Sequence, residues 1–586
     1  MTGCRRAARV LLSVGPLLLS GCGPSPTETL PGVLFVSIDT LRPDHLGAYG
    51  HPEARTPHLD ALARRSALFT EARVPYPLTL PSHSSMMTGR TPYRHGARRN
   101  DSFALDPELP TLAGEFGRAG YATGAVVSTF VLNRNFGLAA PFGTYLDLAD
   151  AGPVQSDLNE RRAGETTRLS AEWLGARPDS SFFFWTHYFD PHDDYLPPPP
   201  WNRVFGEGEI RQYDGEVAYT DQHFGELLRA VRARQRGGDV LVVVTSDHGE
   251  AFGEQGEFGH GFFLYDVTVR VPLLIGRARG GEPSIHDEYV STLDLFPTVC
   301  RLAGLPVPEG MPGRFLDPFG SGPHGNRPLY LETFEPTVAY GATDLRAVVD
   351  DGWKWIEAPT PELYELVTDP HELENLEGAE PDREGPLRDE LARHLEAEQT
   401  VAARADRGAV AAVDDATRAR LRALGYLSSE EDADHTWSRR DPKEIVHLLP
   451  KMFRGIRHCL DGEMEEGLAL LGEVLEEDPV NSKALHWLSE DRILEEDWDG
   501  ALDLYRTALE YDPENVGLRS QLGVVALRAR RPDEAIAALR EVVRQDPDHV
   551  AGWLNLASAE LQARHPRNAV HAVRRALEID PWNPMA

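Results

Sequence analysis

A fixed spacing in the last quarter of the chain most constrains its fold. The dipeptide Asp-Pro begins at residues 478, 512, 546 and 580, so the interval is 34 residues each time. Small residues keep the same register, at Gly467, Ala501, Ala535 and Ala569. A small residue lets two helix backbones approach, and a proline ends the helix before it. The interval therefore predicts two helices per repeat over residues 445–586.

This pattern resembles the tetratricopeptide repeat, which has the same period. The resemblance implies an all-α solenoid whose concave surface binds a protein or peptide partner. A plain spacer role is the alternative. The charged, Ala-rich stretch before the repeats, residues 391–444, is interpreted as an interdomain linker.

Composition excludes several functions. The 586 residues carry 59 Lys and Arg against 92 Asp and Glu, which gives a formal net charge of −33. Nucleic-acid binding needs clustered basic residues, so no nucleic-acid partner is expected. Four cysteines do not make a disulfide scaffold. Cys300 and Cys459 belong to different predicted domains, and we expect both to be unpaired.

The N-terminus is interpreted as a targeting segment. A basic start precedes a short apolar run, Val10 to Leu19, that is too short to span a bilayer. Residues 1–21 are therefore predicted to be a signal peptide. The sequence Leu19-Ser-Gly-Cys22 resembles a bacterial lipobox, which implies a lipidated Cys22, a tether over 22–31 and a lipid anchor in the membrane of the bacterial cell envelope (outer membrane or periplasmic face). An ordinary secretory signal with a chance cysteine is the alternative.

Residues 32–390 are predicted to form one α/β domain with a largely parallel sheet flanked by helices. Three apolar, strand-like runs end at Asp39, Asp190 and Asp247, and His248 follows the last of these. In open α/β sheets ligands bind beyond the carboxyl ends of the strands, so these residues predict a shared metal site. Turn formation or helix capping is the alternative explanation of such aspartates.

The segment Pro75 to Arg90 carries the candidate nucleophile. Pro81 suits the first turn of a helix, and Ser82 to Met87 can continue it. The hydroxyl of Thr79 is then expected just before a helix N-terminus, an end that favours anions. With a bound divalent cation to remove its proton, this oxygen can attack phosphorus or sulfur.

These segments resemble the sulfatase family of the alkaline-phosphatase superfamily. The resemblance rests on Asp39-Thr-Leu-Arg-Pro-Asp-His-Leu-Gly-Ala-Tyr49, Leu80-Pro-Ser, Thr88-Gly-Arg90, Ser246-Asp-His-Gly-Glu250 and Glu362-Leu-Tyr364. It covers residues 32–376 and implies a mixed sheet sandwiched by helices. Three positions depart from the family. Sulfatases carry Cys or Ser, the precursor of formylglycine, where Thr79 stands, Arg where His83 stands, and usually a second Asp where Thr40 stands.

The set Asp39, Thr79, Asp247 and His248 is instead similar to the metal-binding set of the phosphoethanolamine and phosphoglycerol transferases, which use a Thr nucleophile. Two carboxylates, one imidazole and one alkoxide favour Zn²⁺ or Mn²⁺, with Ca²⁺ as the alternative. One bound ion is expected, and a second ion stays open.

The resemblance also implies roles around the ion. His192 and His260 are assigned to oxyanion binding and leaving-group protonation, so with Thr79 they are the predicted catalytic residues. Arg42, His83 and Asp190 are weaker candidates for contact with the substrate.

The resulting prediction is a metal-dependent, sulfatase-family hydrolase of phosphate or sulfate esters with a Thr nucleophile. A phospho-alcohol transferase and a repeat scaffold with a relic catalytic domain are the alternatives. The transferases it resembles hold their donors with transmembrane helices, which this chain lacks, so hydrolysis is favoured.

Overall fold

The computed structural model describes residues 32–100, 105–148, 160–234, 239–320, 325–402, 440–460 and 462–579. The predicted signal peptide, Cys22, the tether, the linker residues 403–439 and the last Asp-Pro pair lie outside these residues. Within them, no helix is both apolar and long enough to cross a membrane. Cys300 and Cys459 are buried free thiols, as expected.

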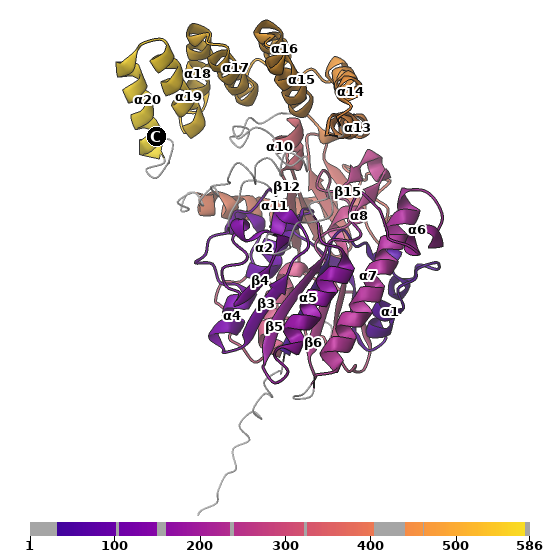
Figure 1. Cartoon of the computed structure of the whole chain (residues 1–586). Helices are drawn as coiled ribbons and strands as arrows, with labels where there is room; N and C mark the ends of the chain where they lie inside the picture. Colours follow the sequence, from indigo (N-terminus) through magenta and orange to yellow (C-terminus); the bar gives the residue numbers. More distant parts are fainter. Residues whose placement is uncertain are drawn as a thin grey trace, which may run out of the picture.

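A nine-stranded mixed sheet forms the centre of the α/β domain (Figure 1), with strand order β10-β2-β9-β6-β1-β5-β3-β4 and β11 paired to β2. Strands β6, β1, β5, β3 and β4 run parallel, whereas β9 is antiparallel to both of its neighbours. The strands are β1 Gly32–Ile38, β2 Ser66–Arg73, β3 Ala122–Val126, β4 Thr144–Leu146, β5 Phe182–Tyr188, β6 Leu241–Ser246, β9 Arg270–Arg277, β10 Ser284–His286 and β11 Val290–Ser291.

Both faces of this sheet are buried, which explains its continuous apolar strands. In β1, Leu34 and Val36 pack into a core on one face, while Val33 and Phe35 pack into a core on the other. The first face is covered by α1 (Pro57–Ala63), α5 (Ala163–Gly175) and α7 (Glu209–Arg232). The second is covered by α2 (Thr79–Thr88), α4 (Leu112–Arg118) and α9 (Leu295–Leu302). The predicted fold class is confirmed.

A second, antiparallel sheet of four strands follows. Its strands are β12 Leu329–Thr333, β13 Leu345–Asp350, β14 Trp353–Glu357 and β15 Glu362–Glu365. Helix α11 (Pro381–Ala402) packs on it, with Leu387 and Leu391 buried against Trp355. This helix runs through the predicted start of the linker at residue 391, because its apolar side belongs to the core of this sheet.

Eight helices form the array that follows residue 440 in the described part of the chain. They are α13 Leu449–Leu460, α14 Met464–Glu477, α15 Ser482–Leu494, α16 Trp498–Tyr511, α17 Val516–Arg528, α18 Pro532–Gln545, α19 Val550–Gln562 and α20 Pro566–Ile579. The predicted small residues Gly467, Ala501, Ala535 and Ala569 are all buried. Asn481, Asn515 and His549 cap the helices α15, α17 and α19 at the same 34-residue interval. We call residues 440–579 the helical array.

Candidate metal and catalytic site

Two neighbouring strands bring the candidate carboxylates together. Strands β1 and β6 are parallel, and Ile38 pairs with Ser246 in their register. Asp39 and Asp247 are the next residues of their strands, so they emerge side by side at one sheet edge. Both side chains are fully buried. Together with His248 they bring ligand atoms within 4.8 Å of one another.

His248 presents an unprotonated nitrogen to these carboxylates. Its Nδ1 donates to the Gly249 carbonyl at 3.1 Å, which leaves Nε2 as the acceptor nitrogen. That Nε2 lies 3.5 Å from Asp247 Oδ2 and 3.7 Å from Asp39 Oδ1. Burial lowers the pKa of His248 well below its usual value, and neighbouring His260 adds to the effect. A neutral imidazole oriented by its other nitrogen is the form that ligates metals.

Thr79, in helix α2, also lies at this cluster. The structure makes Thr79 the first residue of this helix, one step further in than the sequence suggests, because Leu78 is the extended N-cap. Thr79 Oγ1 lies 3.3 Å from His248 Nε2, and the residue is 1 % exposed. Asp39, Thr79, Asp247 and His248, the predicted ligand set, therefore lie together.

The electrostatics of this cluster fit a cation. Burial raises the pKa of Asp39 to about 6. Burial, and then the neighbouring Asp39, raise the pKa of Asp247 well above its usual value. Both oxygens of Asp39 and Oδ2 of Asp247 are buried with no hydrogen-bond partner in the described chain. Two buried carboxylates that repel each other, with a donor on only one of their four oxygens, are the arrangement that a divalent ion stabilises.

Two further histidines lie beneath the cluster. His83 donates from Nδ1 to the Thr79 carbonyl at 2.8 Å and accepts at Nε2 from Ser37 at 2.9 Å, so it supports the backbone of Thr79. It was predicted to contact substrate, but it is fully buried. His187, which sequence reasoning missed, brings its Nε2 to 3.3 Å from Asp39 Oδ2. His83, His187 and Asp247 also group their ligand atoms within 4.8 Å, but both nitrogens of His83 are already hydrogen-bonded, so this group is a poor second metal site.

His192 and His260 lie beside the cluster. The His260 ring lies 4.1 Å from the His248 ring and 5.2 Å from the His192 ring, measured between centroids. His192 donates from Nδ1 to the Asp193 carbonyl, and its Nε2 is buried with no partner in the residues that the structure describes. His260 therefore lies next to the imidazole that faces Thr79, and His192 lies next to His260.

Glu250 is a site residue that was not predicted. It is fully buried, and its Oε1 lies 3.1 Å from His260 Nδ1. Burial raises the pKa of Glu250 to about 8. Glu250 stands three residues after Asp247 in Asp-His-Gly-Glu, and that proximity was the available signal.

Two predicted substrate contacts face elsewhere. Asp190 accepts from Ala163 N at 2.8 Å and from Arg162 at 3.2 Å, so it caps helix α5. Arg42 is buried and donates to Asp44, Glu254 and the Glu250 carbonyl. The structure therefore brings neither side chain into the Thr79 cluster.

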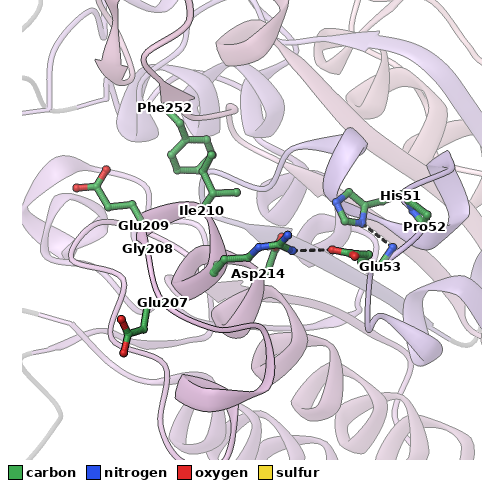
Figure 2. Close-up of a pocket in the computed structure, with 10 residues that line it drawn as sticks. His51, Pro52, Glu53, Glu207, Gly208, Glu209, Ile210, Asp214 and Phe252 are labelled. Carbon is green, nitrogen blue, oxygen red and sulfur yellow. Dashed lines mark hydrogen bonds and ion pairs between the residues drawn. The ribbon is translucent and has the colours of Figure 1, made fainter.

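A separate cavity of about 690 Å³ has Phe252 in its wall (Figure 2). His51, Glu53 and Asp214 line it, and the Arg211 guanidinium lies 2.7 Å from Glu53 and 3.9 Å from Asp214. None of the predicted site residues lines this cavity. A resident guanidinium makes it a poor second cation site, although His45, His51 and Asp214 lie near one another.

Comparison with protein families matches residues 31–305 to the sulfatase family and residues 492–560 to the tetratricopeptide repeat. Residues 253–400 match the C-terminal region of N-sulphoglucosamine sulphohydrolase.

Curated relatives include a Δ4,5-hexuronate-2-O-sulfatase of Bacteroides thetaiotaomicron, 24% identical, with 61% of this chain and 87% of the relative covered. A choline-sulfatase of Rhizobium meliloti is 27% identical, with 60% and 83% covered. Among solved structures, the phosphonate monoester hydrolase of Agrobacterium radiobacter has a TM-score of 0.52 and 24% identity, and covers 63% of this chain and 95% of its own. The structural likeness indicates a shared fold.

Proposed function

Residues 31–305 form a sulfatase-family domain that tetratricopeptide repeats follow, and on this premise we propose that the chain is a metal-dependent ester hydrolase in which Thr79 is the nucleophile. Its curated relatives are named as sulfatases, and the family generally binds a divalent metal. The proposed substrates are phosphate esters first and sulfate esters second.

One observation carries this proposal. The hydroxyl of Thr79 lies 3.3 Å from an imidazole nitrogen that also faces two carboxylates, three of whose four oxygens have no hydrogen-bond donor among the described residues. Asp39, Asp247, His248 and Thr79 Oγ would hold the cation. When bound, a divalent ion supplies charge that lowers the pKa of a coordinated hydroxyl and stabilises a developing oxyanion. Zn²⁺ and Mn²⁺ suit this mixed set of oxygen and nitrogen donors.

The residues of the chain then divide the chemistry. The Thr79 hydroxyl gives its proton to solvent, Thr79 Oγ forms a bond to phosphorus, the bond from phosphorus to the leaving oxygen breaks, and that oxygen takes a proton from a histidine. His260 is one proposed donor, since its ring lies beside that of His248, and His192 is the other, since its ring lies beside that of His260. The positive end of the α2 helix dipole lies at Thr79 and favours the anionic group. Water then attacks phosphorus, which releases Thr79.

The choice of phosphorus over sulfur rests on Thr79 itself. A threonine cannot form the aldehyde of formylglycine, because its β-carbon carries a methyl group. The covalent ester on Thr79 must therefore be cleaved by attack of water on the central atom. A phosphothreonine is suited to this route, and a related nucleophile operates in the Thr transferases that the ligand set resembles.

The test compares Thr79→Val with Thr79→Ser, assayed on nitrophenyl phosphate, phosphodiester and sulfate substrates. Valine keeps the shape of threonine without the hydroxyl, so turnover should be abolished. Serine keeps the hydroxyl, so turnover should persist at a reduced rate. Brief exposure of the wild type to substrate should add phosphate to the Thr79 peptide in mass spectrometry. Activity in Thr79→Val, or preference for sulfate, would contradict the nucleophile or the phosphorus assignment respectively.

Product analysis separates hydrolysis from transfer. A hydrolase releases inorganic phosphate in water, whereas a transferase delivers the group to an added alcohol. A protein partner on the repeats, a lipid anchor at Cys22 and a location in the bacterial envelope stay part of the proposal. Retention of radiolabelled palmitate by the wild type but not by Cys22→Ala would support the anchor.

A further inference from the structure

The helical array is docked on the sulfatase-family domain by its first helix pair. Val446, Met452 and Ile456 belong to the same apolar core as the sheet strands. Lys443 Nζ lies 2.7 Å from Glu362, and Asp441 accepts from Thr360 N at 3.0 Å. Figure 1 shows α13, α14 and α15 nearest the domain and the later helices further out. The first pair is thus packed against the domain rather than tethered to it.

One ion pair of this junction reaches the histidine loop. Arg457 on α13 makes a bidentate contact with Asp194. Asp194 belongs to the loop 191–195, which also carries His192. The Arg457 side chain is 50 % exposed and that of Asp194 is 26 % exposed. A planar guanidinium that meets a carboxylate through two bonds fixes orientation as well as distance.

A second contact reaches the other histidine from the same side. The Lys483 ammonium on α15 lies 4.8 Å from the centre of the Tyr340 ring. Tyr340 in turn packs against Phe262, with centroids 5.2 Å apart, and Phe262 is two residues from His260. The array therefore touches the supports of both His192 and His260.

We propose that the first repeat pair completes the active site, and that Arg457 is a positioning residue that holds the loop of His192. This rests on the function proposed above. Asp193 and Asp194 are adjacent acids, and Arg457 lies 3.9 Å from Asp193 as well as in contact with Asp194. Without Arg457, the two carboxylates would lose the cation that offsets their charges. Mutual repulsion would then turn the loop toward solvent and carry His192 with it.

The first test is the effect of Arg457→Met on catalysis. Arg457→Met should lower kcat/KM by about 10- to 100-fold, which is the scale of an ångström-size misplacement of a catalytic group. Asp194→Asn and the double variant should show the same loss, because all three break one contact. The control is Arg528→Met, which breaks a similar bidentate pair with Glu490 between α17 and α15 and whose side chain is 42 % exposed. It should keep wild-type activity.

The leaving group distinguishes positioning from general damage. If His192 donates a proton, Arg457→Met should slow phenyl phosphate more than 4-nitrophenyl phosphate, because nitrophenolate departs without a proton. Equal losses on both substrates, multiplicative losses in the double variant, or unchanged activity would each overturn the proposal.

Hydrogen exchange tests the contact without any substrate. Peptides covering residues 189–196 should exchange faster in Arg457→Met than in the wild type and Arg528→Met. Unchanged exchange would overturn the proposal. If the wild type hydrolyses none of the test esters, the proposed function fails, and faster exchange in Arg457→Met alone would still establish that the array holds this loop.

Discussion

At the scale of single residues, the site holds two like charges, and three of their four carboxylate oxygens have no hydrogen-bond donor among the described residues. Asp39 and Asp247 are fully buried neighbours, and both have raised pKa values because burial disfavours their charges. In the metal-free protein they repel each other, so this pair costs stability. A bound divalent ion reverses the sign of that contribution, because its charge attracts both carboxylates.

Asp247→Asn should therefore have opposite effects in the two states. Without metal, the variant should melt at the same or a higher temperature than the wild type, since one of the repelling charges is gone. With Zn²⁺ or Mn²⁺, the wild type should gain about 2.7 kcal/mol at 100 times its dissociation constant, and the variant should gain little. Thermal unfolding in chelator and in added metal measures both. A variant less stable than wild type in chelator would contradict this account.

The aspartates also show which parts of the site could be predicted from the sequence. Asp39 and Asp247 were predictable because parallel neighbouring strands end in register. Asp190 follows a strand of the same sheet, yet it caps helix α5. A strand-end aspartate fits either role, and only the position of the next helix decides between them. His187 was not predictable, because an imidazole inside an apolar strand carries no sign of facing Asp39.

At the scale of elements, one buried ionic network joins the two sheets. Asp266, at the start of α8 (Asp266–Val269), contacts Arg73 of β2 at 2.5 Å and Lys354 of β14 at 2.6 Å. The side chains of Arg73 and Lys354 are 0 % exposed. Breaking such a network by removing one partner leaves buried charge uncompensated, which is far more costly than losing a surface pair.

Asp266→Asn should lower the free energy of unfolding by about 3–5 kcal/mol at pH 7. Burial opposes ionisation of Asp266, but Arg73 and Lys354 outweigh it and hold its pKa well below the usual value. The stabilisation is thus present above the unfolded pKa of about 4 and is lost as pH falls below it. Denaturant unfolding at pH 7 and pH 3 checks this, and the difference between variant and wild type should shrink at pH 3.

Asp44→Asn is the matched control for this prediction. Asp44 also pairs with an arginine, but its side chain is 58 % exposed. Its loss should cost about 1 kcal/mol, because the Asp44 carboxylate is largely solvated and buried Arg42 keeps its bonds to Glu254 and the Glu250 carbonyl. Equal losses from Asp44→Asn and Asp266→Asn would show that burial is not the deciding factor.

Substitutions at two glycines of helix α14 distinguish the contribution of helix packing to stability from that of helix propensity. A Cβ on Gly467 would lie 2.6 Å from the Gly455 carbonyl oxygen of α13, whereas a Cβ on Gly472 would meet nothing within 4 Å. Gly467→Ala should therefore cost about 1–3 kcal/mol by forcing α13 and α14 apart. Gly472→Ala should stabilise by about 0.5–1 kcal/mol, because alanine is the better helix former. Urea unfolding measures the free energy of unfolding of both variants. Equal changes in that free energy would contradict the close contact between α13 and α14.

The helix pairs themselves were predictable in detail. Helices α14, α16, α18 and α20 begin at residues 464, 498, 532 and 566, which repeats the 34-residue interval of the sequence. The boundary at residue 390 was less predictable, because α11 is a charged helix whose few apolar residues pack on the second sheet. Composition alone makes such a helix resemble a linker.

At the scale of the whole molecule, the repeat period conceals where the array joins the domain. A period describes contacts between successive repeats, so it carries no information about a face that the first pair buries elsewhere. In the structure the first pair shares its core with the sheets, α15 contributes Ala484 to that core and Leu485 and Ile493 to a second one, and α16–α20 belong to the second core alone. The boundary between the part that unfolds with the domain and the part that unfolds separately is therefore expected inside the array and not at the linker.

Hydrogen exchange in rising denaturant should show this division. A bound metal would stabilise the α/β domain, so it should slow exchange in α13 and α14, whose apolar residues Met452, Ile456 and Leu471 belong to that core. Exchange in α18–α20 should not change, because their neighbours are other repeats. The experiment uses the wild type alone, and the sample in chelator is the reference for the sample with metal. Equal protection of all eight helices by metal would mean that the array and the domain unfold as one unit, whereas protection ending at α11 would mean that the shared core does not couple them.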